Sequence, residues 1–115
     1  MISRAAAAGA GTIIRGGVAR GTPDDWQRSY YMVPSETLQD RWQRANLDEL
    51  LDGSSRVEFT LRFTLSHPGL HTTIVGTRNL EHLLANVRAA KLGPLPAPVL
   101  AEAKRRLTEA TATAA

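Results

Sequence analysis

Apolar positions along the chain alternate between short strand-like runs and longer helical patterns. Residues 11–14, GTII, and residues 72–75, TTIV, are short apolar or β-branched runs next to glycine. Runs of this kind predict buried strands. An alanine-rich segment over residues 3–9 precedes the first run, and we expect it to be a helix that Gly9 ends.

Elsewhere apolar residues recur every three or four positions, as on the buried face of a helix. The expected helices run from residue 35 toward residue 50, from about 55 to 66, from 80 to 91 and from 99 to 108. In the third of these, four apolar residues share a face that we expect to turn inward: Leu80, Leu83, Leu84 and Val87. Residues 22–36 are polar, contain two prolines and predict a long loop.

The order helix, strand, helices, strand, helix is that of a βαβα unit. It predicts an α/β fold with two parallel strands joined by a right-handed crossover. Two strands with helices do not make a self-sufficient sheet. We therefore expect that further strands come from elsewhere or that the chain self-associates.

Length and composition fit a single globular domain of 115 residues, of which 43% are hydrophobic and 22% charged. The absence of cysteine excludes disulfides and cysteine-based zinc sites. No apolar run reaches the roughly 18 residues of a membrane helix, and residues 1–10 are too weakly hydrophobic for a signal peptide. We expect a soluble cytoplasmic protein that does not contact a membrane.

The formal net charge of +3 raises the question of nucleic-acid binding. The 14 basic and 11 acidic residues are interleaved, however, and no block of five or six basic residues occurs. This pattern favours a solvated, mildly basic surface, so no nucleic-acid partner is expected. A basic nucleic-acid binder remains a minor alternative.

The main candidate site follows the second predicted strand. Gly76 lets a ligand approach the backbone, Arg78 offers a planar donor fork, and Thr77 or Asn79 can cap the next helix. A helix start beside an arginine suits a phosphate group. His82 and Asn86 lie one turn and two turns beyond Arg78, and we expect all three on one helix face, where a single ligand could meet them together. The alternative is an ordinary capped helix with polar surface residues.

A glycine-rich segment after the first strand is the second candidate. Its sequence, RGGVARG, lacks the spacing of a Walker loop and of G-x-G-x-x-G. Its backbone amides could wrap a diphosphate, and a plain glycine-rich turn is the alternative. The residues concerned are Arg15, Gly16, Gly17, Val18 and Ala19. His67 and His71 have no carboxylate at a ligand spacing, so no metal is expected.

Two segments of the chain resemble the aldo-keto reductases, which are NADPH-dependent (β/α)8 barrels. The segment RFTLSHPGLHTTIVGTRNLEHLLANVRAA is similar to their last strand and helix, and GTIIRGGVARG to their seventh strand and loop. The resemblance extends from about Ala5 to Leu107. It implies a partial TIM barrel over residues 1–108, formed by the last two βα units and a C-terminal helix. We expect residues 109–115 to be a disordered tail.

The resemblance implies that the cofactor is NADP(H). Arg78, helped by Gly76 and Thr77, would bind the 2′-phosphate. Asn86 would bind the adenine, and His82 stands near the adenosine phosphate. Residues 16–19 would follow the diphosphate and the nicotinamide ribose, with Arg15 where an aromatic ring commonly stacks on the nicotinamide. Ala85 replaces a common glutamate, which implies one adenine contact fewer.

The catalytic Asp, Tyr, Lys and His of the family lie on earlier strands, which this sequence does not contain. The parent chemistry is reversible hydride transfer between NADP(H) and a carbonyl compound, and it needs a general acid. No catalytic residue is assigned, and we expect a truncated reductase that does not catalyse this reaction alone. The expected partners are the nicotinamide dinucleotide and either a second copy or a complementing N-terminal barrel fragment. The alternative is a non-catalytic module that oligomerises or completes a partner.

Overall fold

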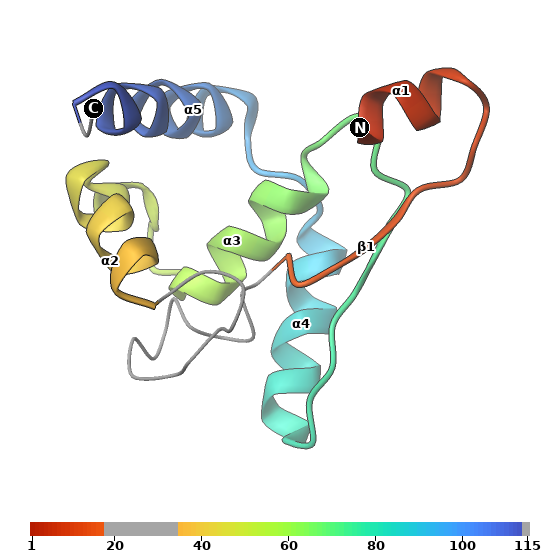
Figure 1. Cartoon of the computed structure of the whole chain (residues 1–115). Coiled ribbons are helices and arrows are strands. Elements are labelled where there is room, and N and C mark those ends of the chain that lie inside the picture. Colours follow the sequence, from red (N-terminus) through yellow and green to blue (C-terminus); the bar gives the residue numbers. More distant parts are fainter. Residues whose placement is uncertain (18–34, 114–115) are drawn as a thin grey trace.

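The computed structural model describes residues 1–17 and 35–113, and this part of the chain is an α/β structure made mostly of helices (Figure 1). In chain order the elements are α1 (Ile2–Ala7), β1 (Ile13–Arg15), α2 (Ser35–Arg44), the 3-10 helix η2 (Leu47–Leu50), α3 (Arg56–Leu65), β2 (Thr72–Ile74), α4 (Leu80–Leu92) and α5 (Ala97–Ala112). Most of the expected loop over 22–36 lies outside the described residues. No helix in the described ranges combines the length and the apolar character needed to span a bilayer.

The two strands lie side by side and run parallel, which confirms the predicted pair. Their register places Ile13 opposite Thr72 and Arg15 opposite Ile74. The two strands therefore end at the same edge of the sheet. β1 begins two residues later than predicted and runs on to Arg15, and β2 ends one residue early at Ile74. The prediction of buried strands is wrong on one face of the sheet, where Ile13 and Ile74 are 66% and 60% exposed.

Thr12, the residue before β1, holds the N-terminal ends of the strands together. It is the buried polar residue of the described chain, with 7% of its surface exposed. Its hydroxyl donates to the Gly69 carbonyl at 2.5 Å and accepts from the His71 N–H at 3.0 Å. Its own N–H donates to Nδ1 of His71 at 2.9 Å, and its carbonyl accepts from Thr72 at 3.1 Å. These bonds fix the register of the sheet.

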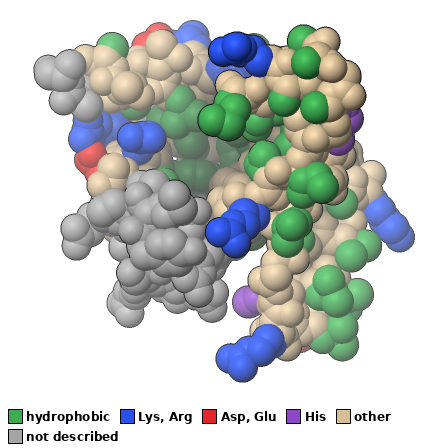
Figure 2. Space-filling view, turned by 45° about the vertical axis from the view of Figure 1, so that its right-hand side comes forward, with side chains coloured by type: hydrophobic (Ala, Val, Ile, Leu, Met, Phe, Trp, Pro, Cys, Tyr) green, Lys and Arg blue, Asp and Glu red, His purple; other side chains and the backbone are tan. Residues whose placement is uncertain are grey.

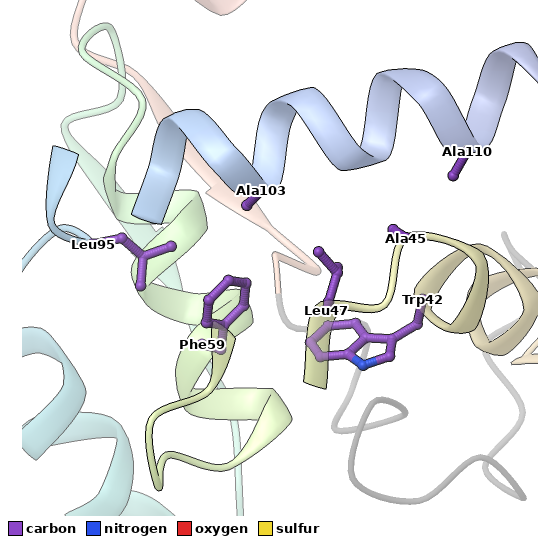
Figure 3. Packing of buried hydrophobic residues seen from close by; sticks show 7 residues of the cluster. All are labelled: Trp42, Ala45, Leu47, Phe59, Leu95, Ala103 and Ala110. Carbon is purple, nitrogen blue, oxygen red and sulfur yellow. The ribbon is translucent and has the colours of Figure 1, made fainter. Parts of the chain in front are cut away.

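The hydrophobic core lies among the helices and not at the sheet. Figure 3 shows its members projecting from α2, η2, α3, α5 and the segment before α5. The rings of Trp42 and Phe59 meet edge to face with centroids 6.0 Å apart. The remaining buried members are Ala45, Leu47, Leu95, Ala103 and Ala110. Small alanines along α5 let that helix approach α2 and η2 closely.

The prediction that the apolar stripe of α4 turns inward is wrong. The exposed fractions are 67% for Leu80, 47% for Leu83, 53% for Leu84 and 43% for Val87. The helix packs on α3 through its other side, where Ala89 is buried. The physical reason is the size of the sheet, since no third strand among the described residues lies under the stripe.

Two helix boundaries also differ from expectation. The helix predicted to run toward residue 50 ends at Arg44, because Asn46 adopts a left-handed conformation with φ of 48° before η2 begins. The final helix, predicted over 99–108, runs from Ala97 to Ala112. Residues 109–112, which we assigned to a tail from the sequence, belong to α5, and Ala110 packs into the core.

Replacing Thr12 by valine tests the hydrogen bonds that join the strands. The change keeps the shape but leaves the Gly69 carbonyl and the His71 N–H without their hydroxyl partner, so we expect a loss of about 1–3 kcal/mol in the free energy of unfolding. Urea denaturation measures this loss. The control is Thr72→Val, an exposed strand position where the change should stay within about 0.5 kcal/mol. Equal effects of the two substitutions would contradict the role of Thr12.

Asp48 makes stability depend on pH in the acid range. Hydrogen bonds from Arg56 and Trp42 lower the pKa of this carboxyl from 3.8 to about 2. A lowered folded-state pKa contributes stability above the unfolded value, and this contribution is lost as pH falls toward 2. Because half of the side chain is exposed, the contribution is about 1 kcal/mol or less.

We therefore expect Asp48→Asn to destabilise the protein at pH 6 and to match the wild type near pH 2, as measured by urea denaturation at several pH values. Asp40→Asn, which removes a charge from an exposed helical ion pair, is the control and should shift stability by about 0.5 kcal/mol or less. A deficit of Asp48→Asn that does not shrink in acid would contradict the assignment.

Candidate functional site

The turn between β2 and α4 holds the main candidate residues. The side chain of Asn79 caps α4, accepting hydrogen bonds from the N–H groups of Glu81 at 2.9 Å and His82 at 3.4 Å. Thr77 supports the cap, because its hydroxyl accepts from the Asn79 N–H at 3.1 Å. Of the two caps considered from the sequence, the structure selects Asn79.

This cap changes how an anion would bind here. Two of the first N–H groups of α4 already have an acceptor in Asn79, so the helix start alone offers less than the sequence indicated. The donors left for a phosphate are those of the preceding turn, Gly76, Thr77 and Arg78, all of which are exposed. A Cβ atom at Gly76 would meet nothing within 4 Å, so no neighbouring group requires glycine at this position.

His82 and Asn86 lie one turn apart on α4 and share a face. His82 is exposed and Asn86 is half-buried. Arg78 precedes the capping residue and lies outside the helix, so helical spacing relates His82 to Asn86 but not Arg78 to either. The guanidinium of Arg78 could contact the same ligand as His82 and Asn86 only through the length of its side chain.

The glycine-rich turn after β1 is explained largely by its own packing. Gly16 has a φ of 78°, which favours glycine. A Cβ atom at Gly17 would lie 3.0 Å from Cγ2 of Thr64, whose hydroxyl donates to the Gly17 carbonyl at 3.1 Å. Both glycines therefore have structural causes. Val18 and Ala19 lie outside the described residues.

The parallel register brings the two candidate segments to one edge of the sheet. Arg15 ends β1 directly opposite Ile74, which ends β2, so the turns that carry Gly16 and Gly76 leave the same edge. In open parallel sheets, ligands bind beyond the carboxyl ends of the strands. The geometry thus places the candidate residues at the edge where such sites form.

Both arginines of this edge keep their charge available. Neither Arg15 nor Arg78 forms an ion pair with another residue in the ranges 1–17 and 35–113. Most ion pairs of the described chain gather at α5, where Arg105 and Arg106 lower the pKa of Glu102 to about 2. The same ranges contain no group of three acidic or histidine side chains able to hold a metal.

The sequence did not reveal the contact that positions the start of α5. Arg62 of α3 donates hydrogen bonds to the carbonyls of Gly93 and Pro94, both at 3.0 Å. The position of Arg62 in a predicted helix did not indicate these hydrogen bonds, because the acceptors are backbone carbonyls about thirty residues away in the sequence. The contact fixes the C-terminal end of α4 and with it the helix that carries His82 and Asn86.

Comparisons with known proteins find no matching family model, no similar curated protein and no similar solved structure.

Replacing Asn79 by alanine tests the cap. We expect a loss of about 1 kcal/mol in stability, because the N–H groups of Glu81 and His82 lose their acceptor. Urea denaturation and amide hydrogen exchange at these two residues measure the effect. Asn79→Asp keeps an acceptor oxygen and should retain protection, whereas unchanged exchange in the alanine variant would rule the cap out.

Proposed function

We propose that this chain carries the adenosine end of an NADP(H) site and corresponds to the last two βα units of an aldo-keto reductase-like barrel. The observation that carries the proposal is the register of β1 and β2. It places Arg15 opposite Ile74, so that the glycine-rich turn and the Gly76–Arg78 turn leave one edge of a parallel sheet.

In this proposal the 2′-phosphate binds to the exposed guanidinium of Arg78, with Gly76 and Thr77 supplying further donors. A planar guanidinium fork suits a phosphate monoester, which accepts two parallel hydrogen bonds. Asn86 binds the adenine, and His82 lies near the adenosine phosphate. At the neighbouring turn the diphosphate follows Gly16 and Gly17, with Arg15 next to the nicotinamide.

The uncovered apolar surface supports a place within a larger α/β assembly. Ile13 and Ile74 are 66% and 60% exposed on one face of the sheet, and the stripe of α4 is exposed as well. In a closed barrel, one face of each strand lines the interior and the helices cover the other face. Two units without their neighbours would expose apolar groups of this kind.

The chemistry of such a barrel is reversible hydride transfer between NADP(H) and an aldehyde or ketone. In this proposal the chain contributes binding groups and the units that complete the barrel contribute the general acid, so by itself the chain binds the cofactor without reducing a carbonyl. Its partners are the dinucleotide and the units that complete the barrel. A non-catalytic interaction module is the second candidate, which the same exposed apolar side chains favour.

The test compares NADP⁺ with NAD⁺, which lacks the 2′-phosphate. We expect NADP⁺ to bind about tenfold or more tightly, because a charge-assisted bidentate contact contributes on the order of 1.5–3 kcal/mol. Titration followed by amide chemical shifts should move Gly76, Thr77 and Asn86. Arg78→Ala should remove the preference for NADP⁺, and steady NADPH oxidation with an aldehyde should not occur in any sample.

Arg88→Ala is the matched control, since it removes an exposed arginine from another face of α4. It should leave the preference for NADP⁺ unchanged. Equal responses to the two dinucleotides, or equal effects of the two arginine substitutions, would contradict the proposed 2′-phosphate site.

A further inference from the structure

The exposed face of α4 has the pattern of a helix that packs against another helix. Leu80, Leu83, Leu84 and Val87 recur at spacings of three and four and are 43–67% exposed. Figure 2 shows hydrophobic side chains gathered at the lower right, over the strands and the lower part of α4. The stripe is separate from the side of α4 that packs on α3 through Ala89.

Two opposite charges border this stripe on one flank. Glu81 and Arg88 are seven residues apart, which is about two helical turns or 10.5 Å along the axis, so they have nearly the same angular position. Both are exposed, and neither forms an ion pair with a residue that the structure describes.

We propose that the stripe of α4 is a self-association surface, at which two copies of this chain pack their α4 helices antiparallel about a two-fold axis near Leu84. In this arrangement Glu81 faces the partner's Arg88, and the same pair forms again on the other side of the axis. A two-fold contact uses one patch twice, so the patch must be complementary to itself. A stripe of leucines with opposite charges at equal distances from its centre meets this condition.

The charges also select the antiparallel orientation. In a parallel pair, the flank that carries Glu81 and Arg88 would face the opposite flank of the partner helix, where Asn86 and Ala90 carry no charge. Only the antiparallel pair brings opposite charges together. Lys91 lies on the same face one turn after Val87, and its charge ends the apolar stripe.

The expected dimer is weak. One helix per copy covers less than the roughly 800 Å² per partner of a standard interface, so we expect a weak dimer with a dissociation constant on the order of tens of micromolar. The inference rests on the surface of α4 and does not require that a dinucleotide binds. Nucleotide titrations at low protein concentration test the other proposal separately.

Sedimentation equilibrium of the 115-residue protein, at about 10 to 500 µM, tests the surface. The wild type should show a monomer–dimer equilibrium, and Leu84→Glu should weaken it at least tenfold. Ile13→Glu is the matched control. Like Leu84→Glu it introduces a glutamate at an exposed apolar position, but that position lies on β1 and not on α4. It should leave the dimer unchanged, and circular dichroism should show that both variants are folded.

Exchanging the two charges tests the orientation. Glu81→Arg and Arg88→Glu should each weaken the dimer roughly three- to tenfold at low salt, since each places like charges together. The double exchange should restore the affinity of the wild type. A protein that is monomeric up to 500 µM, a control as disruptive as Leu84→Glu, or a double exchange that fails to restore association would overturn the proposal.

Discussion

The hydrogen bonds of Thr12 determine how the two strands meet, and the candidate site depends on that geometry. The hydroxyl of Thr12 donates to Gly69 and accepts from His71, which sets the N-terminal ends of β1 and β2 level. Three residues later the strands end opposite one another at Arg15 and Ile74. A slip by one residue would invert which side chains face the helices and would separate the two turns along the sheet edge. One buried hydroxyl thus controls whether the glycine-rich turn and the Arg78 turn are neighbours.

The core forms where helices meet helices, and this leaves the sheet poorly shielded. Trp42, Phe59 and the alanines of α5 bury one another at a distance from the strands. The sheet supplies only three residues per strand, which is too small a surface to hold helices on both faces. The consequence is the exposure of Ile13, Ile74 and the α4 stripe. Their exposure follows from the number of strands, since the sequence pattern of α4 is that of a helix with one buried face.

Local patterns were sufficient to predict most of the elements, whereas contacts between distant segments of the chain left no local signal. Glycines, proline and capping residues predicted the order of helices and strands and the start of α3 after Ser55, and they placed the end of α1, which is at Ala7, within two residues. Periodicity also identified the apolar stripe of α4, but periodicity cannot say whether a partner surface exists. The cap at Asn79 follows from local chemistry. The contacts from Arg62 to Gly93 and from Thr12 to Gly69 join segments 31 and 57 residues apart. Local sequence patterns cannot predict contacts between such distant segments.

The two proposed partners of the apolar surface would bury the same side chains of α4. The stripe of α4 can be covered by further barrel units or by a second copy of the chain, but one stripe cannot contact both at once. Binding equilibria that share a surface are linked, so whichever partner is present at a higher ratio of concentration to dissociation constant displaces the other. Arg78 precedes the helix and lies outside the stripe. A phosphate on Arg78 is therefore compatible with either partner.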